Sequence, residues 1–195
     1  MNSILQITGY VNVVERDSEV IRKQIHPNAP GAFVERVKAG AFRLALSGTA
    51  DIALMVDHRR KIGSTLDGTM QLKEDGIGLK AICQIRDEEV LQAAREHRIR
   101  GWSFGFSDPI DEWIPQENGL YRRYLKHFLL CEVSIVIGRK PAYAATSMET
   151  VDGTSILVET RAAQTKSSPL LEALVGKGLL MRTKKFDGGR DVNEY

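Results

Sequence analysis

The sequence predicts a mostly β single domain with one clear helix between strands, an arrangement that a barrel or a curled sheet would close. Short runs of β-branched and apolar residues recur along the chain, separated by turns rich in Gly, Asn, Asp and Pro. One segment, residues 87–101, carries a full set of helix signals. A chain of 195 residues is also long enough to bury one good core.

The expected elements follow in order along the chain. Residues 4–14 fit a strand pair or a long bent strand, because β-branched and polar side chains are mixed there. Residues 26–31 are a loop by composition. The other early elements are a short helix or strand (32–37), a helical turn (41–46), a compact strand (52–58) and two strands joined by an Asp-Gly turn (69–85).

The helix begins after Asp87, which can cap it, with acidic residues in the first turn and arginines towards its end. Gly101 is the expected terminator. Strand signals then return in residues 102–106, 121–126 and 129–137. Composition changes at about Ala162, so we expect a domain over residues 1–162 and a loosely attached or disordered tail over residues 163–195.

Charge and composition exclude several classes of protein. The 27 basic and 25 acidic residues give a net charge of +2, too weak a field to indicate nucleic-acid binding. No apolar run is long enough to span a membrane, and the N-terminal residues do not resemble a secretory signal. Cys83 and Cys131 are expected to be buried, reduced thiols. The His and Cys spacing indicates no metal site.

Three segments carry groups that chemistry could use, and the first contains His58. It ends the strand predicted over residues 52–58, where alternation puts its side chain on the face of Leu54 and Val56. A lone histidine at a strand end is more often structural than catalytic. The second segment places Trp102, Phe104 and Phe106 on one face and Ser103, Gly105 and Ser107 on the other.

Ser103 thus lies on a face of small groups, with room for another backbone to approach, although a packed core strand would show the same pattern. In the third segment, Glu132 and Ser134 share a face opposite an apolar one. The apolar face consists of Leu129, Cys131, Val133, Ile135 and Ile137. A carboxylate at Glu132 needs a partner if it is buried. That partner is either an imidazole or, in a structural salt bridge, one of Arg122, Arg123 and Arg139.

Together the segments supply a hydroxyl, an imidazole and a carboxylate. Ser103 is a weak nucleophile at neutral pH and needs His58 to accept its proton, while Glu132 can orient that imidazole. The chain has no G-x-S-x-G elbow, which argues against an α/β-hydrolase.

Seven short stretches, in register over roughly residues 5–147, resemble the prohead protease family of tailed bacteriophages. They are residues 33–42, Val56-Asp57-His58-Arg59, residues 62–65, residues 75–79, Gly101-Trp102-Ser103-Phe104-Gly105-Phe106, residues 130–136 and Pro141-Ala142-Tyr143. The resemblance implies a fold similar to herpesvirus assemblin, a closed and mostly antiparallel β-barrel ringed by a few helices.

The resemblance further implies that His58 is the general base, Ser103 the nucleophile and Glu132 the third member. Assemblins use a second histidine there, and His127 is the nearby one; it ranks below Glu132 because it would point to the opposite face. Asp57 ranks lower still, and Ser134 is expected to hydrogen-bond within the site. Arg139 and Lys140 lie where assemblin-like enzymes take oxyanion donors. No metal or organic cofactor is expected.

The family implies work inside an assembling procapsid in the host cytoplasm, not secretion. Its expected substrates are the major capsid protein, the scaffold segment and the protease itself, whose tail is a reasonable place for self-cleavage. A homodimer is expected by analogy. Two alternatives remain open: a catalytically inactive β-barrel scaffold or capsid-assembly protein, and a metallohydrolase that uses His58 and Glu132.

Overall fold

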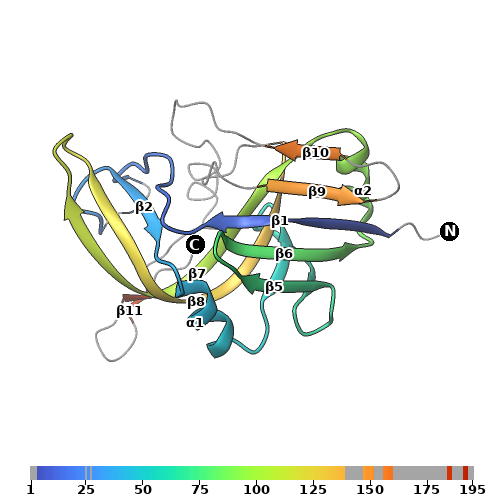
Figure 1. Cartoon of the computed structure of the whole chain (residues 1–195), viewed down its shortest axis with the longest axis horizontal. Coiled ribbons are helices and arrows are strands. Elements are labelled where there is room, and N and C mark those ends of the chain that lie inside the picture. The colour runs from blue at the N-terminus through green and yellow to red at the C-terminus, as the bar shows by residue number, and fades with distance from the viewer. Residues whose placement is uncertain are drawn as a thin grey trace.

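The computed structural model describes residues 4–24, 26, 28–138, 147–151, 156–159, 184–185 and 191–192. In these residues the chain forms two helices and twelve strands, so the prediction of a mostly β protein is confirmed. The strands form two five-stranded sheets and one short pair (Figure 1). The short pair joins β11 (Lys184–Lys185) to β12 (Asp191–Val192). The boundary at residue 162 and the rest of the expected tail lie outside the described residues.

The first sheet has the order β10-β9-β1-β6-β5 and is antiparallel throughout. Its central strand β1 (Leu5–Val13) is one long strand with an irregularity between Tyr10 and Asn12, as the mixed pattern of residues 4–14 predicts. The expected hairpin over residues 69–85 is present. The other strands are β5 (Met70–Glu74), β6 (Gly78–Ile85), β9 (Ser147–Val151) and β10 (Ile156–Glu159).

The second sheet is built on β8, which runs over 17 residues (Tyr121–Ile137). Along one edge β8 pairs with the antiparallel β7 (Ile99–Pro115). It also pairs in parallel with β2 (Phe33–Val37) in its first half and with β3 (Ala53–Val56) in its second half. The strand β4 (Arg60–Ser64) then pairs with β3. These two parallel pairs are the exceptions among the described strand pairs; the others are antiparallel, which agrees with the mostly antiparallel arrangement that the resemblance implies.

β7 and β8 form one long hairpin where the sequence predicts three separate strands. Its continuity depends on bulges, including one between Gly105 and Phe106 of β7 that skips a residue of β8. Pairing among the described strands does not close either sheet on itself. The closed barrel therefore remains a prediction.

Both expected helical segments are helices. α2 (Glu88–Arg95) begins as predicted, with the side chain of Asp87 accepting a hydrogen bond from the Val90 N–H. It ends at Arg95 rather than near Gly101, which is part of β7. α1 (Ala41–Gly48) has no cap from its own sequence. Instead Glu74 of β5 accepts hydrogen bonds from the Gly40 and Arg43 N–H groups, at 2.7 and 2.6 Å.

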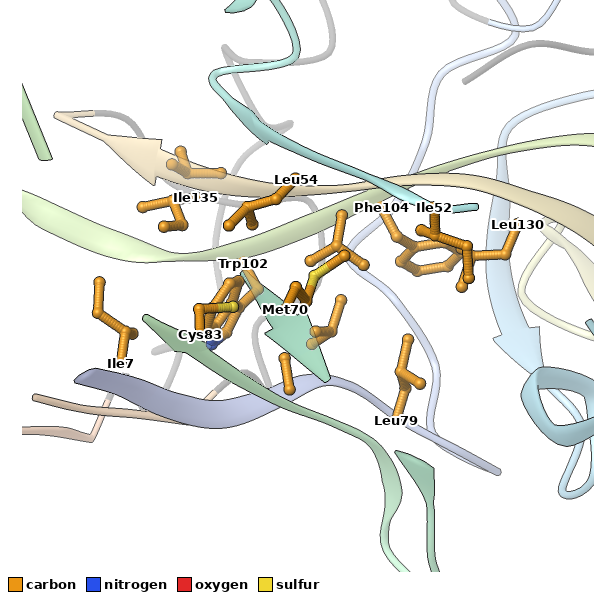
Figure 2. Close-up of a cluster of buried hydrophobic side chains, with 14 of the residues drawn as sticks. Ile7, Ile52, Leu54, Met70, Leu79, Cys83, Trp102, Phe104, Leu130 and Ile135 are labelled. Carbon is orange, nitrogen blue, oxygen red and sulfur yellow. The ribbon is translucent and has the colours of Figure 1, made fainter. Parts of the chain in front are cut away.

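The hydrophobic core lies between the two sheets. Figure 2 shows Ile7, Leu79 and Cys83 of the first sheet facing side chains of β3, β7 and β8. The core side chains of the second sheet that Figure 2 labels are Leu54, Trp102, Phe104, Leu130 and Ile135, all buried. Phe42 of α1 packs edge-on against Phe104 and Phe128. One face of β7 and β8 is thus packed in the core, and the opposite face of these strands is turned away from it.

One cysteine departs from expectation. Cys83 is buried in the core, and burial raises the pKa of its thiol to about 12. Cys131, in contrast, is exposed. The bulge explains this difference: Gly105 pairs with Glu132 and Phe106 pairs with Leu130, so Cys131 is the extra residue of β8. Leu130 takes the core-facing position, and Leu129 and Cys131 turn outward.

Candidate active site

His58 lies in the tight turn that joins β3 to β4. The Arg59 N–H donates to the Val56 carbonyl at 2.9 Å, and both central residues have positive φ, 49° at Asp57 and 57° at His58. Two positive φ values are the signature of a type I′ hairpin turn, for which Asn-Gly is the usual sequence. The strand therefore stops at Val56, and His58 does not continue its alternation.

This turn corrects the predicted face of His58. Leu54 and Val56 pair with Val133 and Ile135 on the core side of the sheet. The left-handed turn instead brings the His58 imidazole to the opposite face, where its Nδ1 contacts Oε1 of Glu132. The His58 main-chain N–H donates to the hydroxyl of Ser134 at 2.8 Å. Both partners lie on the face of β8 that is turned away from the core.

Glu132 comes directly after the bulge at Cys131. Because of the bulge, Leu130 faces the core although Glu132, two positions later, points to the opposite face, which it shares with Ser134 as the sequence predicts. The side chains of His58 and Glu132 are 3% and 12% exposed, so their contact is shielded from water. The His58 imidazole is thus the partner that the Glu132 carboxylate needs in order to be buried.

Ser103 lies on the same face. It pairs directly with Ser134 across the β7–β8 ladder, and Gly105 pairs with Glu132. Directly opposed residues of an antiparallel pair point to the same side, with Cβ atoms about 4.5–5.5 Å apart. The register therefore places the Ser103 side chain beside the two residues that contact His58. Ser103 is 7% exposed, and Trp102 and Phe104 anchor its strand in the core, as the aromatic alternation predicts.

One ring nitrogen of His58 and one carboxylate oxygen of Glu132 remain available for further hydrogen bonds. His58 Nε2 and Glu132 Oε2 are buried, and neither has a hydrogen-bond partner among the described residues. Within that part of the chain no hydrogen bond joins Ser103 to His58. An ionised Glu132 only accepts, so the proton of a neutral His58 belongs on Nδ1 and the free Nε2 carries a lone pair. A catalytic serine–histidine contact is often long before substrate binds.

The other candidates lie elsewhere or act differently. His127 is half-buried on β8, opposite Ile110, and has no described contact with His58. The carboxylate of Asp57 bonds to the main chain of Ile137 and to Arg59 rather than to the imidazole. The arginines proposed as alternative partners of Glu132 pair with other acids: Arg122 with Asp17, and Arg123 with Glu35 and Asp111. Arg139 and Lys140 lie outside the described residues.

Among the described residues, no group of three or more His, Cys, Asp or Glu side chains is placed to hold a metal ion. Neither described helix has the length and apolar character needed to cross a membrane. Sequence reasoning missed the turn that orients His58 and the bulge at Cys131. Neither has a strong local signal, since Asp57-His58 does not resemble a typical turn pair.

A strand serine, an imidazole and a carboxylate on one face of a sheet form a group that serine peptidases use. Residues 1–161 match the family described as caudovirus prohead serine protease, and the chain belongs to this family. No curated protein and no solved structure matches the chain.

Proposed function

We propose that this protein is a serine endopeptidase of phage capsid maturation, with Ser103 as nucleophile, His58 as general base and Glu132 as the group that orients His58. The contact between Glu132 and His58 Nδ1 carries the proposal, because it leaves Nε2 free on the face of Ser103. Membership of the prohead serine protease family supports the same reaction.

The reaction has two halves. His58 Nε2 takes the proton from Ser103 Oγ as the oxygen attacks the scissile carbonyl carbon. When the tetrahedral intermediate breaks down, the C–N bond cleaves and the leaving amine takes that proton, so an ester to Ser103 remains. Water then attacks the ester and gives a proton to His58. The C–O bond breaks, and Ser103 recovers its proton as the new carboxylic acid leaves.

Glu132 has two tasks in this scheme. It holds the imidazole in the tautomer with a free Nε2, and it stabilises the imidazolium that forms in each half-reaction. Burial of the pair strengthens this stabilisation, because little water screens the charges. Ser134 fixes the main chain of the base through the His58 N–H.

The substrates follow from the family rather than from the site. We propose that the enzyme cleaves the major capsid protein, the scaffold segment and its own tail after about residue 162, inside the procapsid in the host cytoplasm. A closed assemblin-like barrel, a homodimer and oxyanion donors from Arg139 and Lys140 belong to the same proposal.

Labelling with a serine-directed fluorophosphonate tests the enzyme assignment. Wild type should label at Ser103, and His58→Ala should lose the label; a scaffold protein without activity would not label in either form. Co-expression with the cognate coat protein tests the substrate: wild type should shorten it, and Ser103→Ala should not. Loss of cleavage on addition of a chelator would favour a metallohydrolase instead.

A further inference from the structure

The turn that carries His58 holds a backbone conformation that its sequence does not favour. Asp57 and His58 are both left-handed, at φ 49° and 57°. Residues other than glycine adopt this region in only a few per cent of cases, although Asp and His do so more readily than most. Two in succession persist only where contacts from the surrounding structure hold them.

The side chain of Asp57 supplies one such contact. Its Oδ1 accepts a hydrogen bond from the main-chain N–H of Ile137 at 2.9 Å, and its own N–H donates to the Ile135 carbonyl at 3.0 Å. The Asp57 side chain is 7% exposed. If the parallel β3–β8 ladder continued past Val56, the Ile137 N–H would donate to the main-chain carbonyl of Asp57. The carboxylate of Asp57 accepts that hydrogen bond instead. The ladder therefore ends at Asp57 while the Ile137 N–H of β8 keeps an acceptor, and the main chain at Asp57 and His58 can turn away from β8.

We infer that Asp57 is a positioning residue for His58: its buried carboxylate replaces a ladder carbonyl and so fixes the left-handed turn that brings the imidazole to Glu132. The inference rests on the proposed function and extends it to a residue outside the catalytic group. Asp57 acts through the main chain, because its two oxygens are bonded to Ile137 and Arg59, and Glu132 occupies the imidazole Nδ1.

The acceptor at Oδ1, rather than the negative charge, performs this task. The ion pair of Oδ2 with Arg59 has a distance of 3.0 Å, but the Arg59 side chain is 44% exposed, so solvent screens it. Asn offers an uncharged amide oxygen in the place of the Asp57 Oδ1 and tolerates left-handed backbone. Gly tolerates the same φ without strain but offers no acceptor. These two substitutions separate the hydrogen bond from both charge and backbone strain.

The experiment compares Asp57→Gly and Asp57→Asn with wild type in two measurements: the rate at which a fluorophosphonate labels Ser103, and the proton NMR resonance of the His58 Nδ1–H that bonds to Glu132. Asp57→Gly should fold, lose the resonance and label about 100-fold more slowly, because small errors in geometry cost about that much. Asp57→Asn should keep the resonance and label within about threefold of wild type, as the same argument from geometry requires.

Asp75→Gly is the matched control. Asp75 also accepts main-chain hydrogen bonds, from Ile77 at 2.8 Å and Gly78 at 3.2 Å, but it lies in the turn between β5 and β6 of the other sheet. Its variant should label like wild type. Folded Asp57→Gly with wild-type labelling, or Asp57→Asn as slow as Asp57→Gly, would overturn the inference. If Asp57→Gly does not fold, loss of the resonance in Asp57→Asn overturns it. A wild type that never labels refutes the proposed function instead.

Discussion

The main chain of His58 and the side chain of Ser134 are joined by a buried hydrogen bond in which the His58 N–H donates to Ser134 Oγ at 2.8 Å. The imidazole of the same residue contacts Glu132, two positions earlier on the same face of β8. One strand therefore holds both the backbone and the ring of the proposed base. On its other edge the same strand pairs Ser134 with the proposed nucleophile, Ser103.

Replacing Ser134 with Ala should impair both stability and reactivity. The variant leaves the His58 N–H buried without an acceptor, which costs roughly 1–3 kcal/mol of unfolding free energy. It also removes one of the contacts that hold the main chain of the base to β8, so fluorophosphonate labelling should slow by about 10- to 100-fold. Urea denaturation and labelling rates measure the two effects on the same protein preparation.

Ser18→Ala is the control for Ser134→Ala. Ser18 Oγ likewise accepts a buried hydrogen bond from a main-chain N–H, that of Glu35, at 2.9 Å. Its loss should cost a similar unfolding free energy and leave labelling unchanged. Equal labelling rates in the two variants would show that Ser134 has no role in positioning His58.

Glu132→Gln should greatly slow the labelling of Ser103 by a fluorophosphonate while the protein still folds. The amide can donate to Nδ1 and so favour the tautomer with its proton on Nε2, which cannot take the Ser103 proton. An equivalent change in a serine-protease triad costs roughly four orders of magnitude in rate. The control is Glu112→Gln, at an ion pair with Lys126 whose side chains are both 49% exposed. Labelling of Glu132→Gln within tenfold of wild type would contradict the role given to Glu132.

The sequence predicts most of the elements, because strand alternation and helix caps are local signals. Asp87 caps α2 as expected, and the aromatic alternation of Trp102, Phe104 and Phe106 places Ser103 on the correct face. The sequence also names Ser103, His58 and Glu132 as candidates, and the structure brings His58 and Glu132 into contact on the face of Ser103. The parallel pairing of β3 with β8 cannot be predicted in this way, since it joins residues about 80 positions apart and no local pattern encodes it.

The sequence assigns His58 and Cys131 to the wrong face of the sheet. Both errors arise because the strand alternation of side chains is interrupted next to these residues. Strict alternation puts His58 on the core face, but the turn at Asp57 reverses its direction. Alternation also makes Cys131 a buried residue, but the bulge makes it the extra residue of β8 between Leu130 and Glu132, where it is exposed. Turns and bulges of this kind depend on contacts with distant strands, such as the one between Asp57 and Ile137. A single sequence does not reveal them.

The bulge makes the two cysteines chemically distinct. Cys131 is exposed, whereas Cys83 is buried and has a pKa raised to about 12 by burial. Iodoacetamide reacts with exposed thiolate, so the native protein should be alkylated at Cys131 alone and the urea-unfolded protein at both cysteines. Peptide mass spectrometry identifies the modified residue. Alkylation of Cys83 at the same rate as Cys131 in native conditions would contradict the burial of Cys83 in the core, and no alkylation of Cys131 would contradict the register of β7 and β8.

The stability of the fold should depend on pH through His26. This residue packs edge-on against Phe33 of β2 and Trp113 of β7. Burial, with a further contribution from the positive charge of Arg123, lowers the pKa of His26 to about 4 from its usual 6.5. Between these values the unfolded chain binds a proton that the folded chain does not. Stability should therefore be lost as pH falls from about 6.5 to about 4, by about 3 kcal/mol in total.

Urea denaturation of His26→Phe across this pH range isolates the effect from that of the carboxylates, which titrate in both proteins. Phe keeps the aromatic contacts with Phe33 and Trp113 but cannot bind a proton, so its unfolding free energy should fall less than that of wild type between pH 6.5 and 4. His97 is exposed and has a φ of 53°, which Asn tolerates, so His97→Asn should follow wild type. Parallel pH curves for wild type and His26→Phe would mean that His26 is protonated equally in the folded and unfolded chains, contrary to its burial between β2 and β7.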